Sequence, residues 1–312
     1  MKRIVGLVAT LTVALSLAAP PPASPHAFAS ALSGVPEFFP TRVRWAGHPH
    51  NTSNLTYYGG AVETAPAVYI SWWGPEWLTG FSTGGYTSTQ AISYTTDFFN
   101  NVGGSSWENI TSQYCQGVAT GTVTCGSSGQ HIQNSTGQLK GTWNDTTVVP
   151  ASPTQSDIAS AAQRLMQHFS YSANATYFVF TPSGKSMRGF TTSWCAWHSV
   201  TSSSSGSLAY AYMPYQPDAG SACGANFVNS TNSSYGNGYF DGFSVVGGHE
   251  YAEAETDPRP SAGAYAWTDS GGNEIGDKCA WSASSTNVTL GSHLYAVQPL
   301  WSNATSGCVT RY

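Results

Sequence analysis

Two short stretches of the chain have the hydrophobic pattern of buried strands. Residues 67–73 read Ala-Val-Tyr-Ile-Ser-Trp-Trp and end at a Gly-Pro pair, and residues 176–181 read Thr-Tyr-Phe-Val-Phe-Thr and end at Pro182. Runs of β-branched and aromatic residues of this length, bounded by Gly or Pro, are typical of strands covered on both faces. Residues 208–213 predict a third such strand.

Amphipathic helices are predicted between these strands. One helix is expected to begin at the capping candidates Ser88 or Thr89 and to run to about residue 100. The other is expected to start after Pro153 and to cover residues 157–169. Both segments repeat apolar side chains at helical spacing. The inward-facing residues expected are Ile92, Thr95, Phe98 and Phe99 in the first helix, and Ile158, Ala161, Ala162, Leu165, Met166 and Phe169 in the second. Alternating strands and helices favour an α/β fold, here a single domain with a mixed sheet flanked by helices.

A third helix is predicted over residues 243–255, which contain no proline. Because Pro258 disfavours the helical conformation in the residue before it, the helix is expected to end near Thr256 or Asp257. The remaining C-terminal part is more irregular, with strands expected near residues 264–268 and 294–297.

Acidic residues are concentrated on and after this third helix. The chain has 16 acidic residues, and eight of them lie between residues 241 and 277, together with a single base, Arg259. The eight are Asp241, Glu250, Glu253, Glu255, Asp257, Asp269, Glu274 and Asp277. Because charge is sparse elsewhere, we expect this segment to use its carboxylates for binding or catalysis.

The centre of the acidic segment is an HExxE pattern, from His249 to Glu253. His249 and Glu253 are four residues apart, so they share one helix face and could bind the same metal ion. Glu250 lies about 100° further round the helix and could act as the general base toward a water molecule. The pattern is that of the HExxH metallopeptidases with the second His replaced by Glu, which predicts a zincin-like active helix.

A metal ion would need further ligands from outside the helix. Asp257 is disfavoured because it would lie ~12 Å along the axis from His249 if the helix continued, so it is expected to cap the helix end instead. Glu274, Asp277 and His293 on the returning chain are better candidates. Residues expected to lie around the ligands are His198, Tyr251, Asp257 and His293, with Tyr251 or His198 as an oxyanion stabiliser.

The N-terminal residues 1–29 resemble a secretory signal peptide. Lys2 and Arg3 precede an apolar run over residues 4–19, and residues 27–29 read Ala-Phe-Ala, a small-x-small cleavage pattern. A membrane anchor is a weaker interpretation, because three prolines follow a run that is short for a bilayer span. We expect an N-terminal arm or pro-segment over residues 30–60 and an α/β domain over residues 61–312, secreted and monomeric.

Cysteine usage and net charge agree with export. The six cysteines, Cys115, Cys125, Cys195, Cys223, Cys279 and Cys308, form an even set, which in an exported chain predicts three disulfides. Of the 15 pairings, we expect the one that joins neighbours in the sequence. After signal removal 9 basic and 16 acidic residues remain, a net charge of −7, which argues against nucleic acid as the partner.

An ordered set of short segments resembles the phosphate-induced, EXORDIUM-like family of secreted proteins. The segments are residues 68–74, the helix with Gln90 and Asp97, Ser106-Trp107, and residues 177–181, 195–198, 208–212 and 235–240. Residues 249–257 with 274–279 look more like the bacterial branch of that family. The resemblance implies an extracellular, cell-wall-associated protein.

Three functions remain open from the sequence. The first is a zinc-dependent metallopeptidase-like hydrolase that acts on peptides, with Glu250 as the base and His249, Glu253, Glu274 and Asp277 as metal ligands. Because one His with two carboxylates makes a harder site than two His with one, calcium or manganese is also compatible. The second is a non-catalytic module that binds cell-wall polymer or carbohydrate and holds a structural ion. The third is a glycosidase with paired carboxylates such as Glu250 and Asp277.

Overall fold

The computed structural model describes residues 34–46, 52–230, 238–261 and 264–312. The predicted signal peptide lies outside these residues. All described residues belong to one compact unit. No helix among them is long and apolar enough to cross a membrane.

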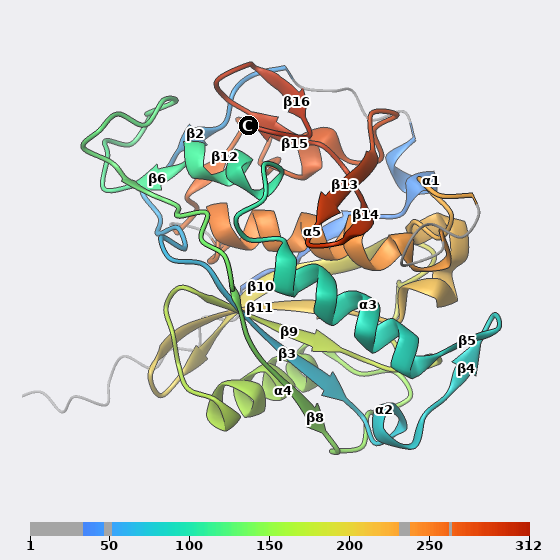
Figure 1. Ribbon diagram of the computed structural model, residues 1–312. Helices are drawn as coiled ribbons and strands as arrows, with labels where there is room; N and C mark the ends of the chain where they lie inside the picture. Colours follow the sequence, from blue (N-terminus) through green and yellow to red (C-terminus); the bar gives the residue numbers. More distant parts are fainter. Residues whose placement is uncertain (1–33, 47–51, 231–237, 262–263) are drawn as a thin grey trace, which may run out of the picture. The chain divides into compact units, whose positions relative to one another are not determined.

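A six-stranded mixed sheet forms the framework, in the order β1-β10-β11-β9-β3-β8 (Figure 1). The strands are β1 (Glu37–Pro40), β10 (Trp194–Ser203), β11 (Gly206–Met213), β9 (Ala175–Phe180), β3 (Ala67–Trp73) and β8 (Leu139–Asp145). Strands β11, β9, β3 and β8 run parallel to one another, whereas β10 pairs antiparallel with both β11 and the edge strand β1. The predicted mixed sheet is therefore confirmed, and part of the expected N-terminal arm is one of its strands.

Helices cover both faces of this sheet. Helix α4 (Gln155–His168) packs on one face, and α3 (Ser88–Asn101) and α5 (Asp241–Thr256) lie on the other (Figure 1). Both α3 and α4 begin with a capping box, made by Thr87 with Gln90 and by Thr154 with Asp157. The capping residue of the first helix is therefore Thr87 and not the expected Ser88 or Thr89, because the Thr87 hydroxyl accepts from the Gln90 backbone N–H.

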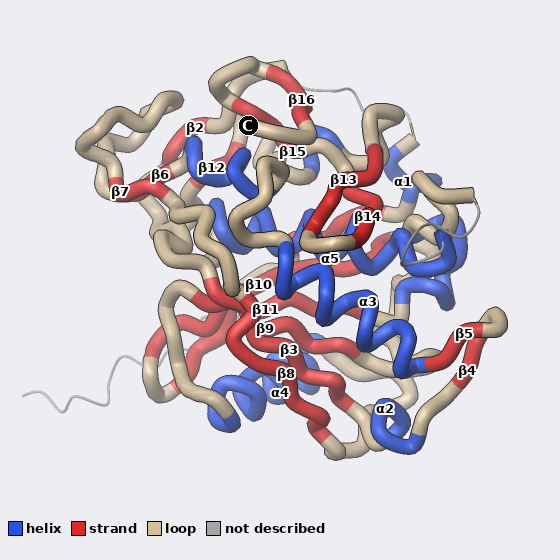
Figure 2. Tube along the Cα trace, in the orientation of Figure 1, coloured by secondary structure: helices blue, strands red, loops and turns tan. Residues whose placement is uncertain are grey.

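Short elements complete the fold around these layers (Figure 2). The two-stranded pairs are β2 (Thr56–Tyr57) with β12 (Trp267–Thr268), β4 (Ser82–Thr83) with β5 (Tyr86–Thr87), β6 (Cys115–Gln116) with β7 (Gln130–His131), β13 (Thr286–Leu290) with β14 (His293–Val297), and β15 (Leu300–Ser302) with β16 (Gly307–Val309). The short helices are α1 (Arg42–Trp45), α2 (Glu76–Thr79), η1 (Glu108–Gln113), η2 (Gln216–Cys223), η3 (Gly238–Phe240) and η4 (Asp277–Cys279).

Helix α5 is buried along its whole length, including its charged residues. Two glycines allow it to pack closely: a Cβ on Gly248 would lie 3.0 Å from the Trp107 ring, and one on Gly247 would lie 3.5 Å from Phe99 and from Met213. A helix buried all round is normally apolar. The carboxylates and the imidazole of α5 therefore need specific partners, because a buried charge without one is costly.

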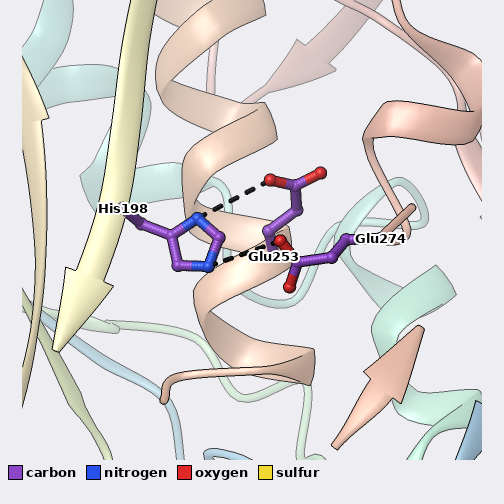
Figure 3. A group of neighbouring side chains, drawn as sticks. All are labelled: His198, Glu253 and Glu274. Atoms are coloured by element: carbon purple, nitrogen blue, oxygen red, sulfur yellow. Dashed lines mark ion pairs between the residues drawn. The ribbon is translucent and has the colours of Figure 1, made fainter. Parts of the chain in front are cut away.

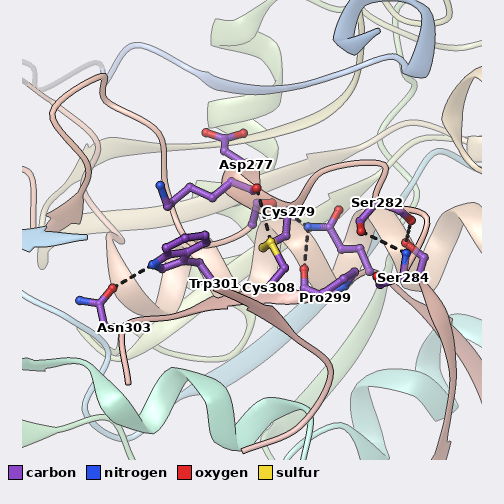
Figure 4. Close-up of a disulfide and its surroundings, with 12 residues drawn as sticks. Asp277, Cys279, Ser282, Ser284, Pro299, Trp301, Asn303 and Cys308 are labelled. Carbon is purple, nitrogen blue, oxygen red and sulfur yellow. Dashed lines mark hydrogen bonds between the residues drawn. A yellow bond between two sulfur atoms is a disulfide. The ribbon is translucent and has the colours of Figure 1, made fainter. Parts of the chain in front are cut away.

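Three disulfides staple the fold, and they join the cysteines in the predicted neighbour pairing. Their bonds are Cys115–Cys125, Cys195–Cys223 and Cys279–Cys308. The third disulfide ties η4 to the C-terminal strand β16 (Figure 4). Disulfides of this kind are typical of extracellular proteins.

Candidate metal centre

Helix α5 supplies three side chains to a buried polar cluster. His249 Nε2 lies 2.9 Å from Glu253 Oε2, as expected for residues four apart on one helix face. Glu250 is fully buried beside them, and its Oε1 atom has no hydrogen-bond partner among the described residues. The helical pattern of the sequence thus places the HExxE side chains as predicted.

Strand β10 adds His198 to the same cluster (Figure 3). Its Nδ1 atom lies 3.3 Å from Glu250 Oε2 and 3.6 Å from Glu253 Oε2, and its Nε2 atom lies 3.6 Å from Glu274 Oε2. From the sequence, His198 was expected to lie around the ligands. The structure places it in direct contact with three carboxylates, because β10 runs beside α5.

The chain that returns after α5 supplies Glu274 and Asp277. Asp277 Oδ1 lies 3.8 Å from His249 Nε2, and its side chain is 21% exposed, whereas Glu274 is almost fully buried. The intervening backbone is anchored: Trp301 N donates to Ile275 O at 2.9 Å, and Gln298 Nε2 donates to Gly276 O at 2.8 Å.

The returning segment is also fixed by Lys278 and by a disulfide. The Lys278 ammonium lies 3.1 Å from Asp269 Oδ2 and 4.2 Å from the centre of the Trp301 ring. The neighbouring Cys279–Cys308 disulfide and the Asp277 and Trp301 side chains are shown in Figure 4. The segment is therefore pinned by a disulfide, an ion pair and a cation–π contact, which restricts its carboxylates to one place.

Gly276 is what lets the returning segment come so close to the helix. A Cβ at this position would lie 2.5 Å from His249 Nδ1 and 2.9 Å from Glu253 Oε1. The next residue, Asp277, donates its backbone N–H to Glu253 Oε1 at 2.9 Å. No side chain other than hydrogen fits between the backbone and the His249 ring.

Within the described part of the chain, two overlapping sets of side chains could hold a metal ion. One is His249, Glu253 and Asp277; the other is His198, Glu253 and Glu274; within each set the ligand atoms lie within 4.8 Å of one another. Both oxygens of Glu274 and Nε2 of His198 are buried without a hydrogen-bond partner among the described residues. Orphaned oxygen and nitrogen atoms that converge in this way fit a cation better than they fit one another.

We call the six residues His198, His249, Glu250, Glu253, Glu274 and Asp277 the imidazole cluster. Burial lowers the pKa of His249 to about 4, although the Asp277 charge opposes this. Burial, followed by the neighbouring His249, lowers the pKa of His198 to about 3. Both rings are therefore neutral near pH 7, which is the form that binds metals.

The carboxyl groups of the imidazole cluster shift in the opposite direction. Burial, and then the negative charge of Glu253, raise the pKa of Asp277 to about 8. Burial likewise raises the pKa of Glu250, Glu253 and Glu274 well above the usual range. Without a cation these groups cannot all be ionised together, so a bound divalent ion would release protons from them.

The other predicted site residues lie in different surroundings. Asp257 is the C-cap residue of α5 and accepts from the Ala266 N–H at 3.1 Å, as expected for a capping role. His293 Nδ1 lies 3.0 Å from Asp97 Oδ2 on α3, so it belongs to neither ligand set. Tyr251 Oη donates to Gln138 Oε1 at 3.0 Å and lies beside Glu255 and Glu108.

A second group of buried carboxyls, Glu63, Glu108 and Glu255, contacts the opposite face of α5; we call it the His-free cluster. Glu255 follows Glu253 by two residues, about 200° round the helix. A protonated Glu108 donates to Glu255, whose pKa burial raises to about 7. Glu63 accepts from the Thr176 hydroxyl at 3.0 Å. Glu255 belongs to the acidic segment of the sequence, whereas Glu63 and Glu108 lie far from it in the sequence.

No family model, curated protein or solved structure matches this chain.

Proposed function

We propose that the protein is a metallopeptidase-like hydrolase whose centre is the imidazole cluster. The observation that supports this most is the set His249, Glu253 and Asp277, with Glu250 next to it on the same helix. One neutral imidazole and two carboxylates form a donor set that can bind zinc, and also manganese. Calcium fits less well, because it prefers a shell made of oxygen alone.

The chain's own residues would divide the chemical work. A bound divalent ion would polarise the scissile carbonyl and lower the pKa of a water molecule beside it. Glu250 would take the proton from that water and pass it to the leaving amine. This role needs the ionised carboxylate, which a nearby divalent cation favours. His198, whose Nδ1 lies 3.3 Å from Glu250 Oε2, would orient the Glu250 carboxylate.

A non-catalytic module with a structural ion is the second candidate. It is favoured by the burial of His249, Glu250 and Glu274, each at most 1% exposed, because a structural ion is usually enclosed by its ligands. A glycosidase that uses only two carboxylates is less well supported, since both imidazoles would then lack a role. We also propose that the protein is EXORDIUM-like, monomeric and located at the cell wall. The three disulfides agree with an extracellular protein.

The test compares wild type with His249→Ala and Glu250→Gln, each loaded with zinc, manganese or calcium. We expect about one ion in wild type and in Glu250→Gln and none in His249→Ala, with cleavage of a peptide library by wild type alone. If metal is retained but no form cleaves peptides, including variants in which the contacts of strand β1 are removed, the structural ion is favoured. Metal-free protein in all three preparations would contradict both candidates.

A further inference from the structure

Strand β1 lies along the outer edge of β10, next to the imidazole cluster. The two strands are antiparallel, with Glu37 opposite His198 and Phe39 opposite Ala196. Residues opposite one another in such a pair project to the same face of the sheet. Glu37 and Phe39 therefore project to the face on which His198 meets helix α5.

The side chain of Phe39 fills a slot between two rings of the body of the protein. It is fully buried, stacked on His249 at 3.9 Å and on Trp281 at 4.9 Å between ring centres. The Trp281 indole N–H donates to Pro40 O at 2.8 Å. The slot accepts a flat aromatic side chain carried by an extended backbone.

Glu37, two residues before Phe39 on the same strand, is partly exposed. It lines a surface pocket of about 390 Å³, together with Tyr58, Tyr265, Thr268, Asp269 and Ser270–Gly272. Tyr265 Oη donates to Glu37 Oε1 at 3.5 Å. Because Glu37 is opposite His198 in the strand pair, its position is next to the cluster as well as at the pocket.

The geometry points to β1 as a tethered stand-in for a substrate. We propose that the β10 edge binds an extended polypeptide with an aromatic side chain between His249 and Trp281, and that residues 34–40 block this position in the form described here. This inference rests on the proposed function, because it names the substrate class of the same site. Adding a strand to a free sheet edge is a general way to bind a peptide, and a sugar chain lacks the alternating donors and acceptors that the edge requires.

The contacts that hold β1 suit a displaceable strand. It is four residues long, and hydrogen bonds beyond its ladder flank it, from Gly34 N to Val200 O at 2.9 Å and from Thr41 N to Ser193 O at 3.2 Å. A short edge strand opens more readily than a central one. Once β1 is displaced, the β10 backbone beside His198 is free to pair with another chain.

The test uses the full chain with Glu37→Gln, Phe39→Ala and both together, and Val35→Ala as a matched control. Val35 lies in the same segment but is 67% exposed. Internally quenched peptides with and without one fixed Phe serve as substrates. We expect the double variant to cleave the Phe peptides at least about tenfold faster than wild type, which corresponds to about 1.4 kcal/mol of lost segment binding. A synthetic peptide of residues 34–46 should inhibit the double variant, and a copy with both substitutions should not.

Equal cleavage by wild type, control and double variant would overturn the inference, as would failure of the synthetic peptide to inhibit. Glu37→Gln alone should raise cleavage in the same direction, which guards against misfolding of Phe39→Ala. If no form cleaves peptides although metal binding depends on His249, the proposed function fails separately. The rate at which a chelator removes the metal then decides: faster release from the double variant than from Val35→Ala supports a cover by β1, and equal rates contradict it.

Discussion

The two faces of helix α5 carry two acidic clusters that differ in one respect. Both are buried, and in both burial raises the pKa of the carboxyl groups. The His-free cluster resolves the conflict by sharing a proton between Glu108 and Glu255. Both clusters contain buried carboxyl oxygens without a hydrogen-bond partner among the described residues, but only the imidazole cluster adds two neutral rings that offer lone pairs. Buried carboxyls alone therefore do not indicate a metal centre; convergent imidazoles next to them do.

The largest expected effect is on the pH dependence of stability without metal. A carboxyl whose folded pKa is raised stabilises the fold below its unfolded pKa and loses this contribution as pH rises through its folded pKa, about 8 for Asp277. The lowered pKa of His198 and His249 acts only below about pH 6.5, where their unfolded forms gain protons. Between pH 6.5 and 8 the free energy of unfolding of the metal-free protein should therefore fall. The expected decrease is about 1.4 kcal/mol per pH unit for each carboxyl group that stays protonated only in the folded state.

The measurement is thermal unfolding across that pH range, with and without metal. Metal binding releases protons, so bound metal should remove the downward slope or reverse it. A metal-free protein whose melting temperature rises from pH 6.5 to 8 would contradict a raised pKa for the carboxyl groups of the imidazole cluster.

The next effect concerns the close approach of Gly276. Gly276→Ala would place a methyl group 2.5 Å from His249 Nδ1, so the returning segment must shift away from α5. Overpacking of this kind costs about 1–3 kcal/mol of stability, and we expect metal affinity to fall with it. Gly272→Ala is a control for loop flexibility, since its position has a positive φ but no neighbouring atom within 4 Å of a Cβ. Loss of metal affinity in both variants alike would show that the loop backbone, and not the His249 contact, matters.

A smaller effect is expected for His198→Gln. Because His249 and Asp277 can still bind the ion, metal affinity should fall about 10–100-fold, as is usual for residues that orient ligands. The Glu250 carboxyl loses its imidazole neighbour at 3.3 Å, so the pH profile of any hydrolysis should shift as well. Complete loss of metal in this variant would place His198 among the essential ligands.

The smallest effect is expected in the His-free cluster. In Glu108→Gln an amide N–H replaces the carboxylic acid O–H as the donor to Glu255, so unfolding free energy should change by less than about 1 kcal/mol. Metal content should be unchanged. A large drop in either quantity would show that the His-free cluster also binds a cation.

Much of the fold could be predicted from the sequence because its signals are local. The runs that became β3 and β9, the stripe on α4 and the end of α5 before Pro258 each depend on neighbouring residues. The spacing of His249 and Glu253 within one helix is local in the same sense. The neighbour pairing of the cysteines was confirmed because each disulfide closes a short loop.

The rest of the imidazole cluster depends on tertiary contacts that no local pattern encodes. His198 comes 51 residues before His249 and reaches it only because β10 lies against α5. Tyr251 faces Gln138 because it projects from the other side of the helix. The pattern of residues 30–60 looked aperiodic because β1 is only four residues long and contains Pro40 at a shift in register. A short strand with one buried residue has no detectable alternation.

The comparison of the two faces is tested most directly by one matched pair of variants, Glu253→Gln and Glu255→Gln. Both residues lie on α5, both are buried, and both substitutions remove one carboxylate without changing its shape. The measurement is the metal content of the two purified proteins and of wild type after loading with zinc. We predict that Glu253→Gln loses the ion, while Glu255→Gln retains as much as wild type. Equal metal content in the two variants, whether full or absent, would contradict the assignment of the metal to the imidazole cluster.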